Sequence, residues 1–87
     1  MKTIKDQALA SLESLFDAVK KENIRQIEKW GIQDRSPYEW LTWTTEELGE
    51  LAQALADHEA RGASRENVFK EAIQTATLCL KIAEMYK

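Results

Sequence analysis

Residues 36–55 read SPYEWLTWTTEELGELAQAL, and this stretch carries the clearest helix signal in the chain. Ser36 can cap a helix, Pro37 suits the first helical position, and Glu39 completes a capping box at the third. We therefore predict a helix that continues to about Ala60. Its apolar face consists of residues at helical spacing, namely Leu41, Leu48, Leu51, Ala52 and Leu55.

The segments on either side have helical ends as well. The first can begin at Thr3, with Asp6 as a weak capping-box partner, and Gly31 can end it because glycine enters the left-handed region without cost. The third begins at Ser64 and runs nearly to Lys87. With three glycines, one proline and no alternating runs of β-branched residues, the sequence predicts an all-α fold of three antiparallel helices.

The third helix is more apolar than the other two helices of one chain can cover. The first has a single apolar stripe, formed by Leu9, Leu12, Phe16, Val19, Ile24, Ile27 and Trp30. The third has a main apolar face, formed by Phe69, Ala72, Ile73, Ala76, Leu80 and Ala83, and a second side with Leu78 and Ile82. A helix that is apolar on two faces is packed on both. We therefore predict a homodimer or homotetramer with four-helix-bundle packing.

Length, charge and cysteine content exclude several classes of protein. The chain has 87 residues, so we expect residues 1–87 to form a single domain of marginal stability. Its net charge of −3 argues against binding to a nucleic-acid polymer, and no apolar run approaches the ~20 residues of a membrane span. The lone Cys79 excludes an intramolecular disulfide, and its apolar surroundings predict a small core residue in a cytoplasmic protein.

The middle of the second helix carries a group of glutamates that can meet at one point. Glu47 and Glu50, at i and i+3, lie about 60° apart around the helix, and Glu46 lies on the same side. Like charges this close repel unless a cation lies between them, and Mg²⁺ prefers oxygen ligands of this kind. The third helix offers Glu71, with Gln74 three residues later, to complete a set of four oxygen ligands.

A glutamate-rich stripe is also what an ordinary solvated helix face looks like, and this interpretation stays open. Two details favour a ligand instead. Gly49 lies mid-helix, where glycine costs about 1 kcal/mol relative to alanine, which indicates close approach of something. Trp43 lies one turn before Glu47, near the Glu47 and Glu50 side, where an indole could stack on a base.

These residues carry a family resemblance. Glu46-Glu47-x-x-Glu50, followed by Glu71-x-x-Gln74 on the next helix, resembles the EExxE…ExxD signature of the MazG-like all-alpha NTP pyrophosphatases. The segment before it, Arg25-Gln26-x-x-Lys29-Trp30-Gly31-x-Gln33, is similar to the opening of a short branch of that family associated with phages and mobile elements. The resemblance covers roughly residues 24 to 86.

The resemblance implies a nucleotide substrate cleaved between its α- and β-phosphates, which gives a monophosphate and pyrophosphate. The cofactor would be Mg²⁺, or Mn²⁺ in its place, held by Glu47, Glu50 and Glu71, with Gln74 where the family has aspartate. Glu46 is the candidate for orienting or deprotonating the attacking water. The site would lie between the second and third helices, with the first helix or a partner chain closing over it.

Gln74 departs from the family pattern and leaves two hypotheses besides an active enzyme. Its carbonyl oxygen can bind Mg²⁺, but it adds a dipole where the family has a charge. The chain could therefore be a catalytically degenerate module that binds nucleotide without cleaving it. It could also be a plain helical interaction protein whose acidic stripe is only solvated surface.

The basic and aromatic residues have both functional and structural interpretations. Arg25 and Lys29 share a helix face and could bind phosphate, or could pair with neighbouring glutamates. Trp30 follows the apolar stripe and is expected in the core. The resemblance suggests that Gln33 reads a base edge, and Arg35 in the connecting loop could reach phosphate. The chain has neither a P-loop motif nor the residues of a hydrolase triad.

Overall fold

The computed structural model describes residues 2–87, and Met1 lies outside the described residues. Three helices make up this part of the chain, α1 (Ile4–Trp30), α2 (Pro37–Arg61) and α3 (Arg65–Met85), and it contains no strand. The predicted all-α class is therefore confirmed. Within the same residues, none of the helices has both the length and the apolar character that crossing a membrane requires.

The helix ends lie where the capping signals predict them. The side chains of Thr3 and Ser36 each accept a hydrogen bond from the backbone N–H three residues later. The carboxylates of Asp6 and Glu39 in turn accept from the backbone N–H of Thr3 and Ser36, so both capping boxes are complete. Ser64 likewise accepts from Asn67 at the start of α3. These contacts satisfy backbone N–H groups that a helix leaves unpaired at its first turn.

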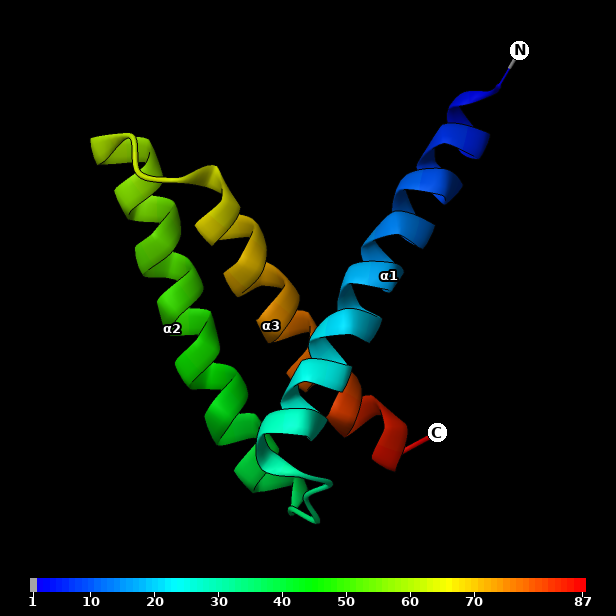
Figure 1. Ribbon diagram of the computed structural model, residues 1–87, viewed down its shortest axis with the longest axis vertical. Helices are drawn as coiled ribbons and strands as arrows, with labels where there is room; N and C mark the ends of the chain where they lie inside the picture. The colour runs from blue at the N-terminus through cyan, green and yellow to red at the C-terminus, as the bar shows by residue number, and fades with distance from the viewer. Residues whose placement is uncertain (1) are drawn as a thin grey trace.

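The α2 and α3 helices pack along each other in opposite directions, whereas α1 packs against α3 and not against α2 (Figure 1). The N-terminal part of α1 stands away from the other two helices, and its first 14 residues, 4–17, are all exposed. The radius of gyration is 15.0 Å, against about 12 Å for a compact domain of this length. One chain is therefore not a closed antiparallel bundle.

The face of α2 that packs on α3 shares only Leu51 with the predicted leucine face. Trp40, Thr44 and Ala54 are buried there, and Glu47 and Leu51 are part-buried between them. These residues follow steps of three and four, the spacing of a helix–helix seam. The other leucines of the predicted face point outward instead, with Leu41, Leu48 and Leu55 each about half exposed, at 52%, 54% and 47%.

The α3 helix has contacts on two sides, as its two apolar faces predict. Leu78 is buried and Ile82 is part-buried, whereas Phe69 and Leu80 of the predicted main face are about half exposed. The prediction of a core position for Cys79 is wrong, because this thiol is exposed.

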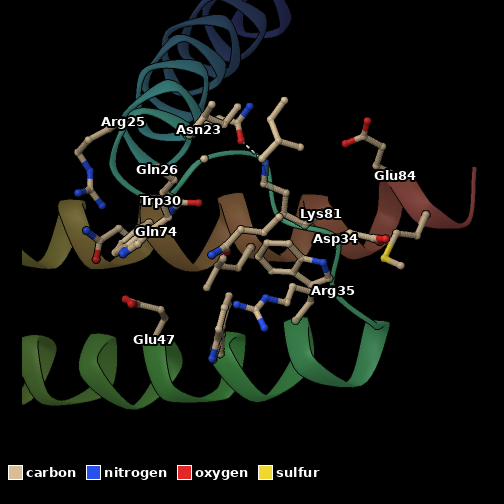
Figure 2. Close-up of a pocket in the computed structure, with 18 of the residues that line it drawn as sticks. Asn23, Arg25, Gln26, Trp30, Asp34, Arg35, Glu47, Gln74, Lys81 and Glu84 are labelled. Atoms are coloured by element: carbon tan, nitrogen blue, oxygen red, sulfur yellow. Dashed lines mark hydrogen bonds between the residues drawn. The ribbon is translucent and has the colours of Figure 1, made fainter.

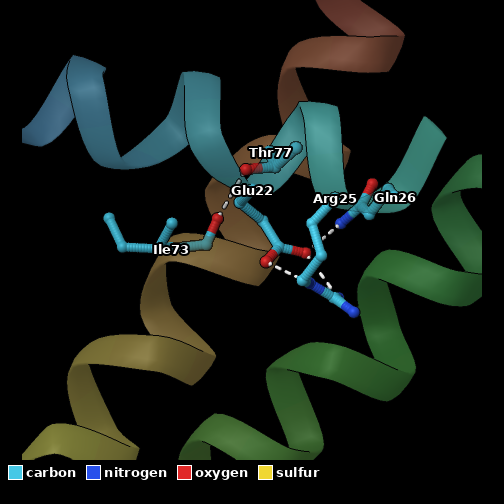
Figure 3. A network of polar contacts seen from close by, with 5 residues as sticks. All are labelled: Glu22, Arg25, Gln26, Ile73 and Thr77. Atoms are coloured by element: carbon cyan, nitrogen blue, oxygen red, sulfur yellow. Dashed lines mark hydrogen bonds and ion pairs between the residues drawn. The ribbon is translucent and has the colours of Figure 1, made fainter. Parts of the chain in front are cut away.

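The α1 helix meets α3 through polar side chains (Figure 3). Glu22, Asn23 and Gln26 are part-buried in its C-terminal half, as are Ala18 and Val19, whereas the rest of the predicted apolar stripe is exposed. Arg25 donates to both oxygens of Glu22, at 2.9 and 2.8 Å, and Gln26 donates to the same carboxylate at 2.7 Å. The Arg25 hydrogen bond is the main reason that the pKa of Glu22 is lowered.

Candidate functional site

Three glutamates meet between α2 and α3. Glu47, Glu50 and Glu71 each offer a carboxylate oxygen, and these three oxygens lie within 4.8 Å of one another. Glu71 is buried, at 9% exposure, Glu47 is part-buried and Glu50 is exposed. The cluster therefore extends from the helix interface to the solvent.

Gln74 lies beside this cluster, one turn after Glu71. When its amide nitrogen faces the carboxylates, it donates to Oε2 of Glu47 at 3.1 Å and to Oε2 of Glu71 at 3.0 Å. When its oxygen faces them, a fourth oxygen joins the group. The amide can thus either bridge two carboxylates or complete a set of oxygen ligands, depending on which end it presents.

The pKa of the Glu47 carboxyl is strongly shifted by its surroundings. Burial raises its pKa to about 7, assisted by hydrogen bonding to Glu71 and by the negative charge of Glu50. Crowded carboxylates bind a proton tightly because ionising each one is opposed by the others. A divalent cation at the same place would relieve this repulsion more completely than a proton does.

The donor set fits a hard divalent cation. Mg²⁺ binds through one or two carboxylates and keeps several waters, and Ca²⁺ takes more oxygens in looser geometry. Glu47, Glu50 and Glu71 supply oxygen only, and the described part of the chain places no histidine or cysteine in the cluster. This chemistry favours Mg²⁺ or Mn²⁺ over metals that prefer softer ligands.

A cavity of about 870 Å³ adjoins the cluster (Figure 2). Its walls come from the end of α1, the connecting loop, the start of α2 and the second half of α3. Glu47 and Gln74 lie in its wall, so the cavity opens onto the carboxylates. This volume lies within the range of pockets that hold small organic ligands, about 300–1,000 Å³.

Indole rings form much of the cavity wall. The Trp40 and Trp43 rings meet edge to face, with centroids 5.5 Å apart and planes at 88°. The Arg35 guanidinium lies 4.9 Å from the centroid of the Trp43 ring. Trp30 also lines the cavity and is 52% exposed, so the prediction of a core position for this residue is wrong.

The predicted phosphate-binding residues have different surroundings. Arg25 lines the cavity but is paired with Glu22, the structural alternative. Lys29 is exposed and does not line the cavity, and its ammonium lies 4.6 Å from the centroid of the Trp30 ring. Two further cations line the cavity, Arg35 and Lys81.

The remaining predicted site residues also line the cavity. Glu46 is exposed at its wall, and Gln33 and Trp43 are part-buried there. Sequence reasoning did not single out Asn23 or Lys81, whose side chains are hydrogen-bonded to each other across the α1–α3 contact. The available signal was spacing, because Lys81 lies two turns after Gln74 on one face of the helix.

Gly49 does not meet a close neighbour within the described chain. A side-chain carbon built there has no atom within 4 Å. The prediction that something approaches this position closely therefore finds no partner among residues 2–87.

Comparison of the chain with protein-family models, with curated proteins and with solved structures finds no match in any of the three. Membership of the MazG-like family therefore remains a proposal that rests on the residues described above.

Proposed function

We propose that the protein is a Mg²⁺-dependent nucleoside triphosphate pyrophosphohydrolase, which cleaves a (d)NTP or a modified nucleotide to the monophosphate and pyrophosphate. The observation that carries this proposal is a cluster of three carboxylates at the wall of a cavity lined by indoles and cations. A Mg²⁺-bound nucleotide requires these three features, oxygen ligands for the metal, aromatic surface for the base and positive charge for the phosphates.

The residues of the cluster have separate roles in this proposal. Glu47, Glu50 and Glu71 would hold the metal, and Gln74 would add its carbonyl oxygen. The bound metal would neutralise phosphate charge and supply an activated water. Glu46, at the cavity wall outside the cluster, is placed to accept a proton or a hydrogen bond from a water in the cavity. The indoles and Arg35 hold the remainder of the substrate.

The first test is release of pyrophosphate from a panel of canonical and modified (d)NTPs, measured with Mg²⁺ and then with EDTA. Metal-dependent release from one nucleotide supports the enzyme and identifies its substrate class. No release with either Mg²⁺ or Mn²⁺ would contradict the proposal.

Substitutions in the cluster test the assignment of the ligands. Glu47→Gln and Glu50→Gln should each lower turnover by at least 100-fold, because losing a metal ligand removes transition-state stabilisation worth several kcal/mol. Helix content by circular dichroism should not change, since glutamine has nearly the same shape as glutamate and removes a charge from a crowded cluster. Glu59→Gln, at an exposed glutamate of α2 outside the cluster, is the matched control and should retain activity.

A binding-only protein is the second candidate, and Gln74 favours it. This neutral amide can bridge Glu47 and Glu71 without any metal. Gln74→Asp should raise Mg²⁺ affinity by about tenfold, because a fourth carboxylate adds charge to the ligand set. The Mg²⁺ titration is monitored through the rise in the midpoint of thermal unfolding. Hydrolysis that appears only in this variant would support the binding-only protein, and an active natural chain would exclude it.

We further propose that the functional unit is a cytoplasmic homodimer or homotetramer built on the outward apolar faces. The supporting observation is that Leu41, Leu48 and Leu55 repeat every seven residues along α2 and are each about half exposed. Exposed apolar surface of this extent is typical of protein–protein interfaces. It also supports the third candidate, a plain interaction protein, which predicts no stabilisation by Mg²⁺ or nucleotide.

A further inference from the structure

The cavity has a second end, two helical turns from the carboxylates. Glu47 lies opposite Gln74, within hydrogen-bonding distance of its amide. Seven residues from each of them, in the same direction along the antiparallel pair, lie Trp40 and Lys81, and both line the cavity. Seven residues are almost two complete turns, so each pair shares a helix face about 10 Å apart.

Lys81 is the unexplained charge at this end. It is part-buried, and its Nζ donates to Oδ1 of Asn23 on α1 (Figure 2). Among residues 2–87, no carboxylate oxygen lies within 4.0 Å of this ammonium. Asp34 and Glu84 also line the cavity, but both are exposed and neither pairs with it. With Asn23 as its hydrogen-bond acceptor among the described residues, the ammonium can still donate to an acceptor on a ligand.

Together the two side chains present mainly hydrogen-bond donors. An ammonium has three N–H groups, of which one is used by Asn23. The Asn23 oxygen accepts from Lys81, its NH₂ group can donate to a ligand, and this residue also lines the cavity. A ligand group that meets the Lys81 ammonium must therefore carry an acceptor. Trp40 and Trp43 beside it favour a planar ring.

We propose that Lys81, positioned by Asn23, reads the base edge of the nucleotide and selects oxo bases, guanine and thymine or uracil, over adenine and cytosine. This inference rests on the proposed function, which puts the phosphates at the Glu47 end. The separation of about two turns is of the order of the span from an α-phosphate to the far edge of its base. Guanine presents an acceptor at O6 and thymine at O4, whereas adenine and cytosine present an amino group in place of that oxygen.

The test measures binding of non-hydrolysable probes, so that it does not depend on turnover. The probes are the four dNTPs with a methylene group between the α- and β-phosphates, titrated calorimetrically in Mg²⁺. The natural chain should bind the dGTP and dTTP analogues at least about tenfold more tightly than the dATP and dCTP analogues, the factor typical of a hydrogen bond to a charged group.

Variants at Lys81 assign the preference to this residue. Lys81→Met keeps the aliphatic stem and should weaken the dGTP and dTTP analogues about tenfold while leaving the other two unchanged. Lys81→Arg retains a donor-only cation and should keep the order of preference. Asn23→Ala should reduce the preference by a smaller factor. Lys70→Met, at an exposed lysine of α3 outside the cavity, is the matched control and should behave like the natural chain.

The outcomes separate this inference from the proposed function. Equal weakening of all four analogues by Lys81→Met would overturn it, since that pattern belongs to a phosphate contact or to a fold defect. Equal binding of all four by the natural chain would overturn it as well, even if pyrophosphate is released. Base-selective binding that depends on Lys81, without any pyrophosphate release, would uphold it and contradict the hydrolase. Failure to bind any of the four would overturn the inference, whereas the proposed function is judged separately by release of pyrophosphate from the full nucleotide panel.

Discussion

At the scale of single residues, Glu47 couples the cluster to the stability of the fold. Its carboxylate lies on the face of α2 that packs on α3, so its charge state affects the helix interface directly. The native pKa of about 7 lies above the ordinary value of 4.5. The folded state therefore binds a proton that the unfolded state has lost between these two values, and stability must fall as the pH rises through this interval.

The first residue-scale prediction concerns this pH dependence. Without divalent metal, the midpoint of thermal unfolding should decrease between about pH 4.5 and pH 7 and then level off. Saturating Mg²⁺ should remove the decrease, because the cation stabilises the ionised cluster. Calorimetry across this range, with EDTA and with Mg²⁺, measures both effects.

Glu47→Gln is the control for the pH prediction. Its amide cannot ionise, so the decrease should disappear with or without metal. Glu22, Glu39 and Glu66 have lowered pKa values and lose their stabilising effect only below the ordinary value, outside this interval. A midpoint in the natural chain that rises steadily from pH 5 to pH 7 would contradict the assignment.

Spacing in the sequence could reveal the role of some residues and not of others. The approach of Glu47 to Glu50 follows from i,i+3 spacing on one helix, and Glu71 was suggested as a partner by the motif. The opposite end of the cavity was not predictable in the same way, because Lys81 meets Asn23 through the crossing of α1 and α3. That crossing is a tertiary contact, and nothing local in the sequence determines it.

At the scale of helices, the ends were predictable and the faces were not. Capping depends on three or four neighbouring residues, so Thr3, Ser36 and Ser64 were sufficient to locate the three helix starts. Which face of a helix is buried depends on which apolar stripe packs against another helix of the same chain. On α2 the inward seam carries Trp40, Thr44 and Glu47, while every leucine of the predicted face except Leu51 points out. Thr44 is tolerated inside because its hydroxyl donates to the backbone oxygen of Trp40 at 2.7 Å.

Gly49 provides the element-scale prediction. Since nothing in the described chain lies within 4 Å of an added methyl group, Gly49→Ala should stabilise α2 by about 1 kcal/mol through its higher helix propensity. Urea unfolding at low protein concentration, without ligand, measures the change. A loss of stability under these conditions would show that the helix needs the space.

At the scale of the whole molecule, the apolar surface is the dominant feature. The half-exposed leucines of α2, the exposed stripe of α1 and the outer face of α3 leave a chain that buries little of its apolar content by itself. The sequence predicted this excess from the two-faced third helix. It could not say which faces would be left over, because that depends on how α1 leans away from α2.

The molecular-scale prediction follows from the proposed assembly. Leu48→Lys should shift the protein to the monomer and raise the dissociation constant at least tenfold, because burying one leucine is worth about 1.5–3 kcal/mol. Sedimentation velocity over a range of concentrations measures the shift. Gln53→Lys, an exposed polar position of the same helix, is the control and should leave the mass unchanged. A natural chain that is monomeric at all concentrations would contradict the assembly.

The free N-terminal half of α1 has a consequence for how the chain samples its conformations. Residues 4–17 are exposed on every side, and a helix of this length in water is only marginally stable. Its amide hydrogens are protected by the capping box and by its own ladder alone, whereas those of α2 and α3 are protected by packing as well. Protection from hydrogen exchange therefore declines from the Glu22 contact towards Ile4. Binding of any molecule to this half of α1, including a second copy of the chain, should therefore be detected as slower hydrogen exchange of these amides.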